Sequence, residues 1–208
     1  RLAELAKASG CATYRELCQK ARYGDQGLQT RIIDAITTQE TLFFRDASPF
    51  EALQYKVLPE LIDAKAATAF PRRLRIWSAA CSTGDEPTTI ACCVAACLPN
   101  LAGWNVRILG TDIGVGALEQ ARAAVFGERA MRLVPEDYRR RFFVKGRDAQ
   151  RWQAKAALTS MIEYRQHNLL ERLGESGFDV AFLKNVLIYF DGPSKKTVLG
   201  HVRDAIRP

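Results

Sequence analysis

Two acids that begin a predicted helix point to a ligand-binding loop in the middle of the chain. The residues RIW at 75–77 predict a short apolar strand. The small residues at 78–84 follow and let the backbone lie close to a ligand. Gly84 permits a positive φ, and Asp85 and Glu86 are typical of a helix start. We therefore predict a strand, a tight loop and a helix in that order.

A third acid stands at the end of a second predicted strand. Val106–Thr111 predicts that strand, and Asp112 follows it directly. Strand, loop, helix, strand and acid are together typical of a nucleoside-binding α/β unit, in which the acid accepts hydrogen bonds from ribose hydroxyls. The alternative is purely structural: Asp85 and Glu86 only cap a helix and Asp112 only ends a strand.

The loop chemistry favours one kind of nucleoside. A dinucleotide site uses several glycines, so that backbone N–H groups and a helix N-terminus hold a pyrophosphate. This loop has only Gly84, and its two acids would repel that anion. S-adenosylmethionine carries a sulfonium and an ammonium but no phosphate. We therefore expect this cofactor, with a dinucleotide-dependent oxidoreductase as the alternative enzyme.

The composition fits one main domain with a small appendage, because 208 residues can bury a sizeable core. No run approaches the roughly 20 apolar residues of a membrane span, and the N-terminus does not read as a signal peptide. Six cysteines without metal-ligand spacing and only two histidines give no expected metal site and suggest a reducing cytoplasm. A net charge of +7 favours an acidic partner but does not demand nucleic acid.

The hydrophobic spacing divides the chain into three parts. Residues 1–36 predict an N-terminal helical domain, and residues 37–70 a linker that includes a cofactor-contacting segment. Residues 71–208 predict a Rossmann-like domain, with Phe178–Leu183 as a buried parallel strand. A basic and aromatic stretch at about 138–164 predicts an insertion. Such a sheet usually continues beyond the last predicted helix, so we expect truncation or disorder at the C-terminal end. Arg1 opens directly into helical sequence, so we expect the start to be cut as well.

Four segments together resemble the CheR-type chemotaxis receptor methyltransferases. They are TTQETLFFR at 37–45, RIWSAACSTGDEP at 75–87, LGTDI at 109–113, and HNLLE at 167–171 with FDVAFLKNVLIYFD at 178–191. The resemblance implies an α/β, Rossmann-like class I S-adenosylmethionine-dependent methyltransferase with a small N-terminal helical domain and a small β insertion. It also implies methyl transfer to glutamate side chains of chemoreceptor cytoplasmic helices, with S-adenosylhomocysteine as product.

The resemblance assigns roles to nine residues. Arg45 and Asn185 are the predicted catalytic residues, and Arg45 would hold either the substrate carboxylate or the cofactor carboxylate. The predicted cofactor contacts are Gln39, Thr41, Arg45, Asp85, Asp112, Asn168, Leu169, Asn185 and Val186. The sequence departs from the family at Gln39, Asp85 and Lys184, where asparagine, glutamate and arginine are usual. Each replacement keeps polarity or charge.

Three aromatic residues in these motifs have a structural interpretation. We expect Phe43 and Phe44 to pack between the helical part and the main domain. Tyr189 is expected to be a packing residue with a satisfied hydroxyl.

The expected partner is the cytoplasmic helical bundle of a methyl-accepting chemoreceptor, with a regulator protein as a further candidate and without membrane insertion. The enzyme would then be cytoplasmic and recruited to membrane receptor clusters. Candidate contacts are Arg15, Lys20, Arg22, Arg31 and Arg139 to Arg141. The insertion lacks a glycine-rich extension, which favours docking without a receptor tail peptide. A non-catalytic cofactor-binding module and a small-molecule methyltransferase are the alternatives.

Overall fold

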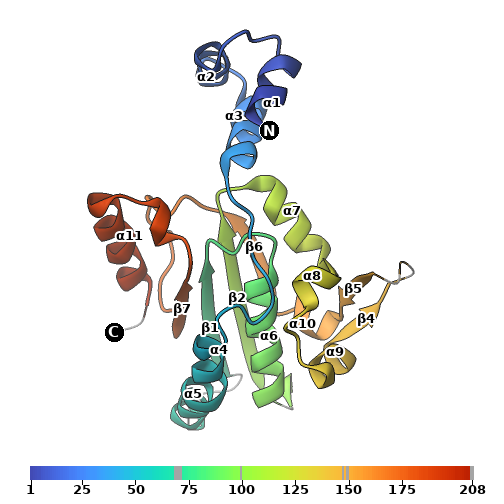
Figure 1. The fold of residues 1–208 in the computed structure, drawn as a ribbon. Helices are drawn as coiled ribbons and strands as arrows, with labels where there is room; N and C mark the ends of the chain where they lie inside the picture. Colours follow the sequence, from blue (N-terminus) through green and yellow to red (C-terminus); the bar gives the residue numbers. More distant parts are fainter. Residues whose placement is uncertain (68–71, 99, 147, 149, 207–208) are drawn as a thin grey trace.

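The computed structural model describes residues 1–67, 72–98, 100–146, 148 and 150–206. Its centre is a parallel sheet with strand order β6–β2–β1–β7 (Figure 1). The four strands are β1 (Arg72–Ala79), β2 (Trp104–Asp112), β6 (Ile162–Gln166) and β7 (Val180–Leu183). The chain thus builds outward from β1 to β2 and β6, and then crosses back to place β7 on the other side of β1.

Successive side chains of β1 point to opposite faces of the sheet, so this strand contributes to the core on both faces. Leu74 and Ile76 pack with the apolar face of α6 (Asp85–Cys97), which includes the fully buried Cys92 and Cys93. Trp77 lies on the opposite face, in a cluster with α11 (Gly192–Ala205). Both cysteines therefore act as small core residues.

The predicted N-terminal helices are present as α1 (Leu2–Ala8), α2 (Tyr14–Arg22) and α3 (Gln26–Ile36). They form a small core of their own around Leu17 and Leu28, and they stand beyond one edge of the sheet (Figure 1). Their junction with the main domain lies near α7 (Val115–Ala123), where the Gly116 N–H donates to the Asp34 carboxylate at 3.2 and 3.3 Å.

The linker contains one helical stretch with a π-helical centre. It runs through α4 (Ser48–Ala52), η1 (Leu53–Val57) and α5 (Leu58–Lys65). The remaining short helical turns are η2 (Leu101–Gly103) and η3 (Leu187–Tyr189). In the described part of the chain, no helix combines the length and apolar character needed to cross a membrane.

The insertion is a small antiparallel sheet with bounds that differ from those predicted. Its strand order is β3–β5–β4, and three short helices accompany it. The elements are β3 (Val125–Gly127), α8 (Glu128–Met131), α9 (Glu136–Phe142), β4 (Phe143–Lys145), β5 (Arg151–Ala154) and α10 (Ala156–Thr159). The expected range 138–164 is wrong at both ends, because β3 lies before it and β6 begins within it.

Phe43 packs against this insertion, not between the N-terminal helices and the main domain. Its ring is fully buried and meets Phe126 edge-on at 4.8 Å and Phe143 at 5.4 Å between centroids. Phe44 lies against Phe50 and Tyr138. The aromatic pair is therefore a packing element, as predicted, but it joins the linker to the insertion.

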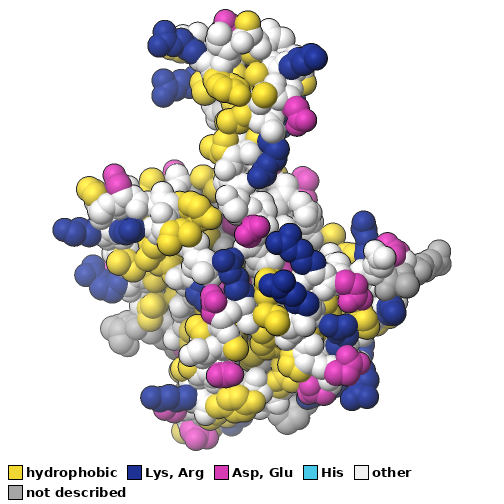
Figure 2. Space-filling model, viewed as in Figure 1, with side chains coloured by type: hydrophobic (Ala, Val, Ile, Leu, Met, Phe, Trp, Pro, Cys, Tyr) yellow, Lys and Arg dark blue, Asp and Glu magenta, His cyan; other side chains and the backbone are white. Residues whose placement is uncertain are grey.

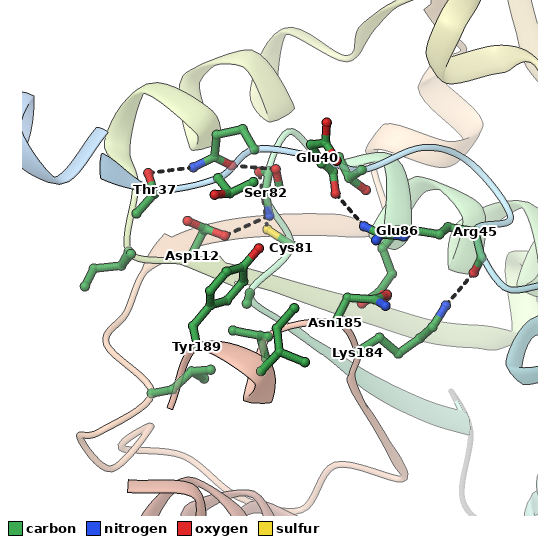
Figure 3. Close-up of a pocket in the computed structure, with 18 of the residues that line it drawn as sticks. Thr37, Glu40, Arg45, Cys81, Ser82, Glu86, Asp112, Lys184, Asn185 and Tyr189 are labelled. Atoms are coloured by element: carbon green, nitrogen blue, oxygen red, sulfur yellow. Dashed lines mark hydrogen bonds between the residues drawn. The ribbon is translucent and has the colours of Figure 1, made fainter. Parts of the chain in front are cut away.

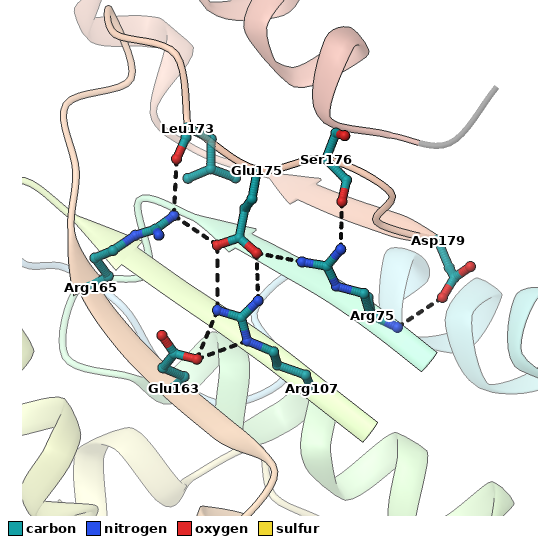
Figure 4. A network of polar contacts seen from close by, with 8 residues as sticks. All are labelled: Arg75, Arg107, Glu163, Arg165, Leu173, Glu175, Ser176 and Asp179. Atoms are coloured by element: carbon teal, nitrogen blue, oxygen red, sulfur yellow. Dashed lines mark hydrogen bonds and ion pairs between the residues drawn. The ribbon is translucent and has the colours of Figure 1, made fainter. Parts of the chain in front are cut away.

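A charge network spans one side of the main sheet (Figure 4). Glu175 lies in the loop before β7, and its carboxylate pairs with Arg75 of β1, with Arg107 of β2 at 2.5 Å and with Arg165 of β6 at 3.0 Å. Burial alone raises the pKa of Glu175, but hydrogen bonds from Arg107 and the charges of the other two arginines lower it overall. The Glu175 carboxylate thus links the loop before β7 to β1, β2 and β6.

We predict that Glu175→Gln lowers the free energy of unfolding by about 1–3 kcal/mol at pH 7, measured by urea unfolding. Because the pKa is lower in the folded state, the stabilisation exists above the ordinary glutamate pKa of about 4.3 and is lost as pH falls through the folded value. Glu163→Gln is the control, since that side chain is 52% exposed and, among the residues that the structure describes, pairs with Arg107 alone. Equal losses in both variants would contradict the bridging role.

Candidate functional site

A cavity of about 460 Å³ opens at the carboxyl edge of the sheet. The loops after all four strands contribute to its wall, together with the segment at 36–45. From β1 the chain continues to β2 on one side, and it later returns to β7 on the other side. The cavity lies at this reversal of the strand order, which is where open α/β sheets bind ligands. Its polar lining includes Gln39, Glu40, Thr41, Arg45, Ser82, Glu86, Asp112, Asn168, Lys184 and Asn185 (Figure 3).

The loop after β1 turns tightly through left-handed conformations. Ala80, Ser82 and Gly84 have φ values of 60°, 50° and 90°. A Cβ at Gly84 would lie 2.8 Å from both the Ala121 Cβ and the Tyr164 hydroxyl, so only glycine fits without displacing them. At Gly84 the close neighbours are thus α7 and β6, and the approach of the loop backbone to a ligand stays a prediction.

Asp112 is held at the floor of the cavity. Its Oδ2 accepts from the Ser82 N–H at 2.8 Å and its Oδ1 from the Gly114 N–H at 2.9 Å. Burial raises the pKa of this carboxyl above its usual value, and the backbone donors oppose that shift. Each carboxylate oxygen keeps further acceptor capacity, so Asp112 can accept hydrogen bonds from a ligand diol.

The two acids at the start of α6 have separate surroundings. Glu86 lines the cavity, and its Oε1 accepts from the Ser78 hydroxyl at 2.8 Å. Asp85 is only 2% exposed, accepts from the Thr83 hydroxyl at 2.8 Å, and is not among the described residues that line the cavity. Adjacent helical residues point about 100° apart, so one of the pair faces the ligand space. The geometry favours Glu86 over the predicted Asp85 for direct contact.

The predicted residues of the linker reach the cavity. Gln39, Thr41 and Arg45 all line it. The Ser82 hydroxyl donates to Gln39 Oε1 at 2.5 Å, and Arg45 Nη1 donates to the Glu40 carbonyl at 2.6 Å. Gln39 thus occupies its position with a hydrogen bond to the β1 loop, even though asparagine is usual there in the resembling family.

The loops after β6 and β7 complete the wall. Asn168 and Leu169 follow β6, Asn185 and Val186 follow β7, and all four line the cavity. Asn185 has a φ of 57°, a left-handed conformation that asparagine tolerates better than most residues. The structure therefore brings eight of the nine predicted residues to one cavity, with Asp85 set behind the lining.

Tyr189 does not have the packed environment that the sequence suggests. It lies in η3, is 63% exposed and lines the cavity mouth. Within η3 the partly buried Leu187 packs toward α11, so the next two residues are turned outward. A helix of three residues is too short to show hydrophobic periodicity, so the sequence could not predict this exposure.

Acidic and cationic side chains line the cavity together. The acids are Glu40, Glu86 and Asp112, and the cationic residues are Arg45 and Lys184. Burial raises the pKa of Glu86, while the charges of Lys184 and Arg45 oppose that shift. The acids suit a cationic nucleoside, because Asp112 can accept hydrogen bonds from a ribose and a carboxylate favours positive charge nearby. The described residues hold no cluster of three potential metal ligands.

The comparisons with known proteins agree with this chemistry. The family description "CheR methyltransferase, SAM binding domain" matches residues 39–208. "Chemotaxis protein methyltransferase 1" of Pseudomonas aeruginosa is 39% identical over 100% of this chain and 76% of its own length. "Chemotaxis protein methyltransferase Cher2" of Pseudomonas putida is 36% identical with the same coverage. The chain therefore belongs to the CheR family of S-adenosylmethionine-dependent methyltransferases.

Proposed function

We propose that the protein transfers a methyl group from S-adenosylmethionine to glutamate side chains on the cytoplasmic helices of a chemoreceptor. The products are a glutamyl methyl ester and S-adenosylhomocysteine. The observation that carries the proposal is one cavity that holds three acids, suited to a cationic cofactor, and Arg45, suited to an acceptor carboxylate. The chemotaxis names of the relatives support the receptor as substrate.

The chemistry asks little of a general base, because a glutamate carboxylate is already ionised at pH 7. When bound, the cofactor supplies a methyl group on a positively charged sulfur, which the carboxylate can attack in line. Arg45 would orient the acceptor carboxylate through its two-pronged guanidinium. Asn185, in its left-handed conformation, would present its side chain near the reacting methyl group. Alignment and exclusion of water then provide most of the acceleration.

The cavity mouth supports a protein acceptor over a small molecule. Three exposed apolar side chains surround it: Ile36 at 57%, Ile188 at 74% and Tyr189 at 63%. An exposed apolar rim around a reaction site is typical of protein docking. The basic excess of the chain fits an acidic helical partner on the cytoplasmic side of a membrane.

Figure 2 shows Lys and Arg side chains over the N-terminal helices and near the centre of the same face. Arg15, Lys20, Arg22 and Arg31 are exposed and remain candidate receptor contacts. Arg139 differs from its neighbours, because its side chain is 19% exposed, donates to the Met131 carbonyl and lies over Trp152. Arg140 and Arg141 are the exposed members of that basic run.

The first test of the proposal is cofactor binding, measured by calorimetry with S-adenosylhomocysteine. Asp112→Ala should weaken binding by about 10- to 100-fold, because it removes charged acceptors for the ribose. Glu86→Gln should also weaken it, and more than Asp85→Asn does. Unchanged affinity in Asp112→Ala would contradict the assignment, whereas a larger loss in Asp85→Asn would restore Asp85 as the contact. Binding of NAD by the wild type would favour an oxidoreductase.

The second test is methyl transfer from tritiated cofactor to receptor-containing membranes. The wild type should leave base-labile label on the receptor, as a methyl ester requires. Asn185→Ala should lower kcat at least 10-fold if its side chain lies at the reacting methyl. Label in a small-molecule fraction alone would indicate a metabolite methyltransferase. Tight cofactor binding without any receptor label would indicate a non-catalytic module.

The third test concerns docking. If basic side chains meet an acidic bundle, receptor binding should weaken as salt rises from about 0.05 to 0.3 M. Replacing Arg15 and Arg22 with glutamate should raise the apparent KM for receptor by about 10-fold while leaving S-adenosylhomocysteine affinity unchanged. The same reversal at Arg140 and Arg141 tests the insertion. The pair that leaves KM unaltered does not belong to the interface.

A further inference from the structure

Arg45 is held in an unusual backbone segment. Its neighbours Phe44 and Asp46 have φ values of 52° and 54°, which place two non-glycine residues in the left-handed region. Such conformations cost energy and persist only where surrounding contacts fix them. Arg45 itself lines the cavity, so these contacts decide where its guanidinium points.

One of those contacts comes from the loop after β7. Lys184, which follows β7 directly, donates from Nζ to the Arg45 carbonyl at 2.5 Å (Figure 3). On the other side of the turn, the Phe44 N–H donates to the Thr89 hydroxyl at 3.3 Å. The lysine bond thus joins two segments that are 139 positions apart in sequence.

The surroundings hold the lysine in this place. Its side chain is 15% exposed, and the ammonium lies 4.5 Å from the centre of the Phe50 ring and 3.9 Å from the Asp46 carboxylate. Glu86 of α6 adds a favourable charge and Arg45 an unfavourable one. An ammonium held by a hydrogen bond to a carbonyl, an ion pair with Asp46 and a contact with the Phe50 ring is well ordered.

We infer that Lys184 is a positioning residue for Arg45, because its ammonium holds the left-handed turn that directs the guanidinium into the cavity. The inference rests on the proposed role of Arg45 in orienting the acceptor carboxylate. It differs from a direct role, in which Lys184 would itself contact substrate, and from simple packing on Phe50. In a positioning role, Lys184 acts on the reaction only through Arg45.

A double-mutant cycle separates these roles. Lys184→Met keeps the apolar stem and removes the donor, so kcat for receptor methylation should fall about 10-fold or more, since small misplacements near the chemistry are costly. Affinity for S-adenosylhomocysteine should stay within about 2-fold. In an Arg45→Met background, Lys184→Met should change kcat by less than about 2-fold. Independent, multiplicative losses would overturn the inference.

Two further variants sharpen the cycle. Lys184→Arg keeps a cationic donor and should retain more of kcat than Lys184→Met; equal losses would count against the inference. Lys155→Met is the matched control, because Lys155 also donates to backbone carbonyls, those of Arg140 and Arg141, but lies in the insertion. Its kcat should equal that of the wild type, and a comparable loss there would show that the Lys184 effect is not specific.

Hydrogen exchange gives a readout that does not need turnover. Amide exchange in the segment 37–47 should quicken in Lys184→Met and not in Lys155→Met, as expected if the lysine bond fixes the turn. Unchanged exchange would overturn the inference. If the wild type transfers no methyl group to receptor, the proposed function fails, while this measurement still decides whether Lys184 orders the Arg45 turn.

Discussion

The hydrogen bond from the Ser82 N–H to the Asp112 carboxylate is the interaction on which the site depends. It joins the loop after β1 to the end of β2, and the second Asp112 oxygen accepts from Gly114 at the start of the next connection. Parallel pairing of β1 with β2 brings these ends together at one edge. A ligand beside Asp112 therefore meets a carboxylate whose orientation the backbone has already fixed. This lowers the entropy cost of ordering the side chain on binding.

Burial of the carboxyl groups determines how the cavity responds to a charged ligand. Desolvation raises the pKa of both Glu86 and Asp112, so their negative charges are costly in the buried site. Lys184 and Arg45 already offset part of that cost for Glu86. A cationic cofactor would offset more of it, which is a physical reason for this cavity to prefer one. Positive and negative side chains thus share one cavity, and in the proposed reaction Arg45 would favour the acceptor carboxylate.

The linker connects the cavity to the N-terminal helices. Residues 37–42 line the cavity and directly follow α3. The junction is tight: a Cβ at Gly114 would lie 3.0 Å from Gln39 Nε2 and 3.1 Å from the Asp34 carboxylate. The same short turn therefore supports Asp112 on one side and the base of the helical domain on the other.

The sequence by itself determined the fold class, three of the four parallel strands, the N-terminal helices and eight residues of the cavity lining. These follow from local patterns: apolar periodicity, a small-residue loop, acids after strands and motifs in fixed order. Only the tertiary structure decided that Glu86 rather than Asp85 faces the cavity, because that depends on how α6 is rotated against the sheet. It also decided the bounds of the insertion, since β3 and β5 pair across 23 or more residues, a separation that local patterning does not encode. The bond between Lys184 and Arg45 was likewise beyond the sequence, because it joins distant segments that meet only when the sheet has formed.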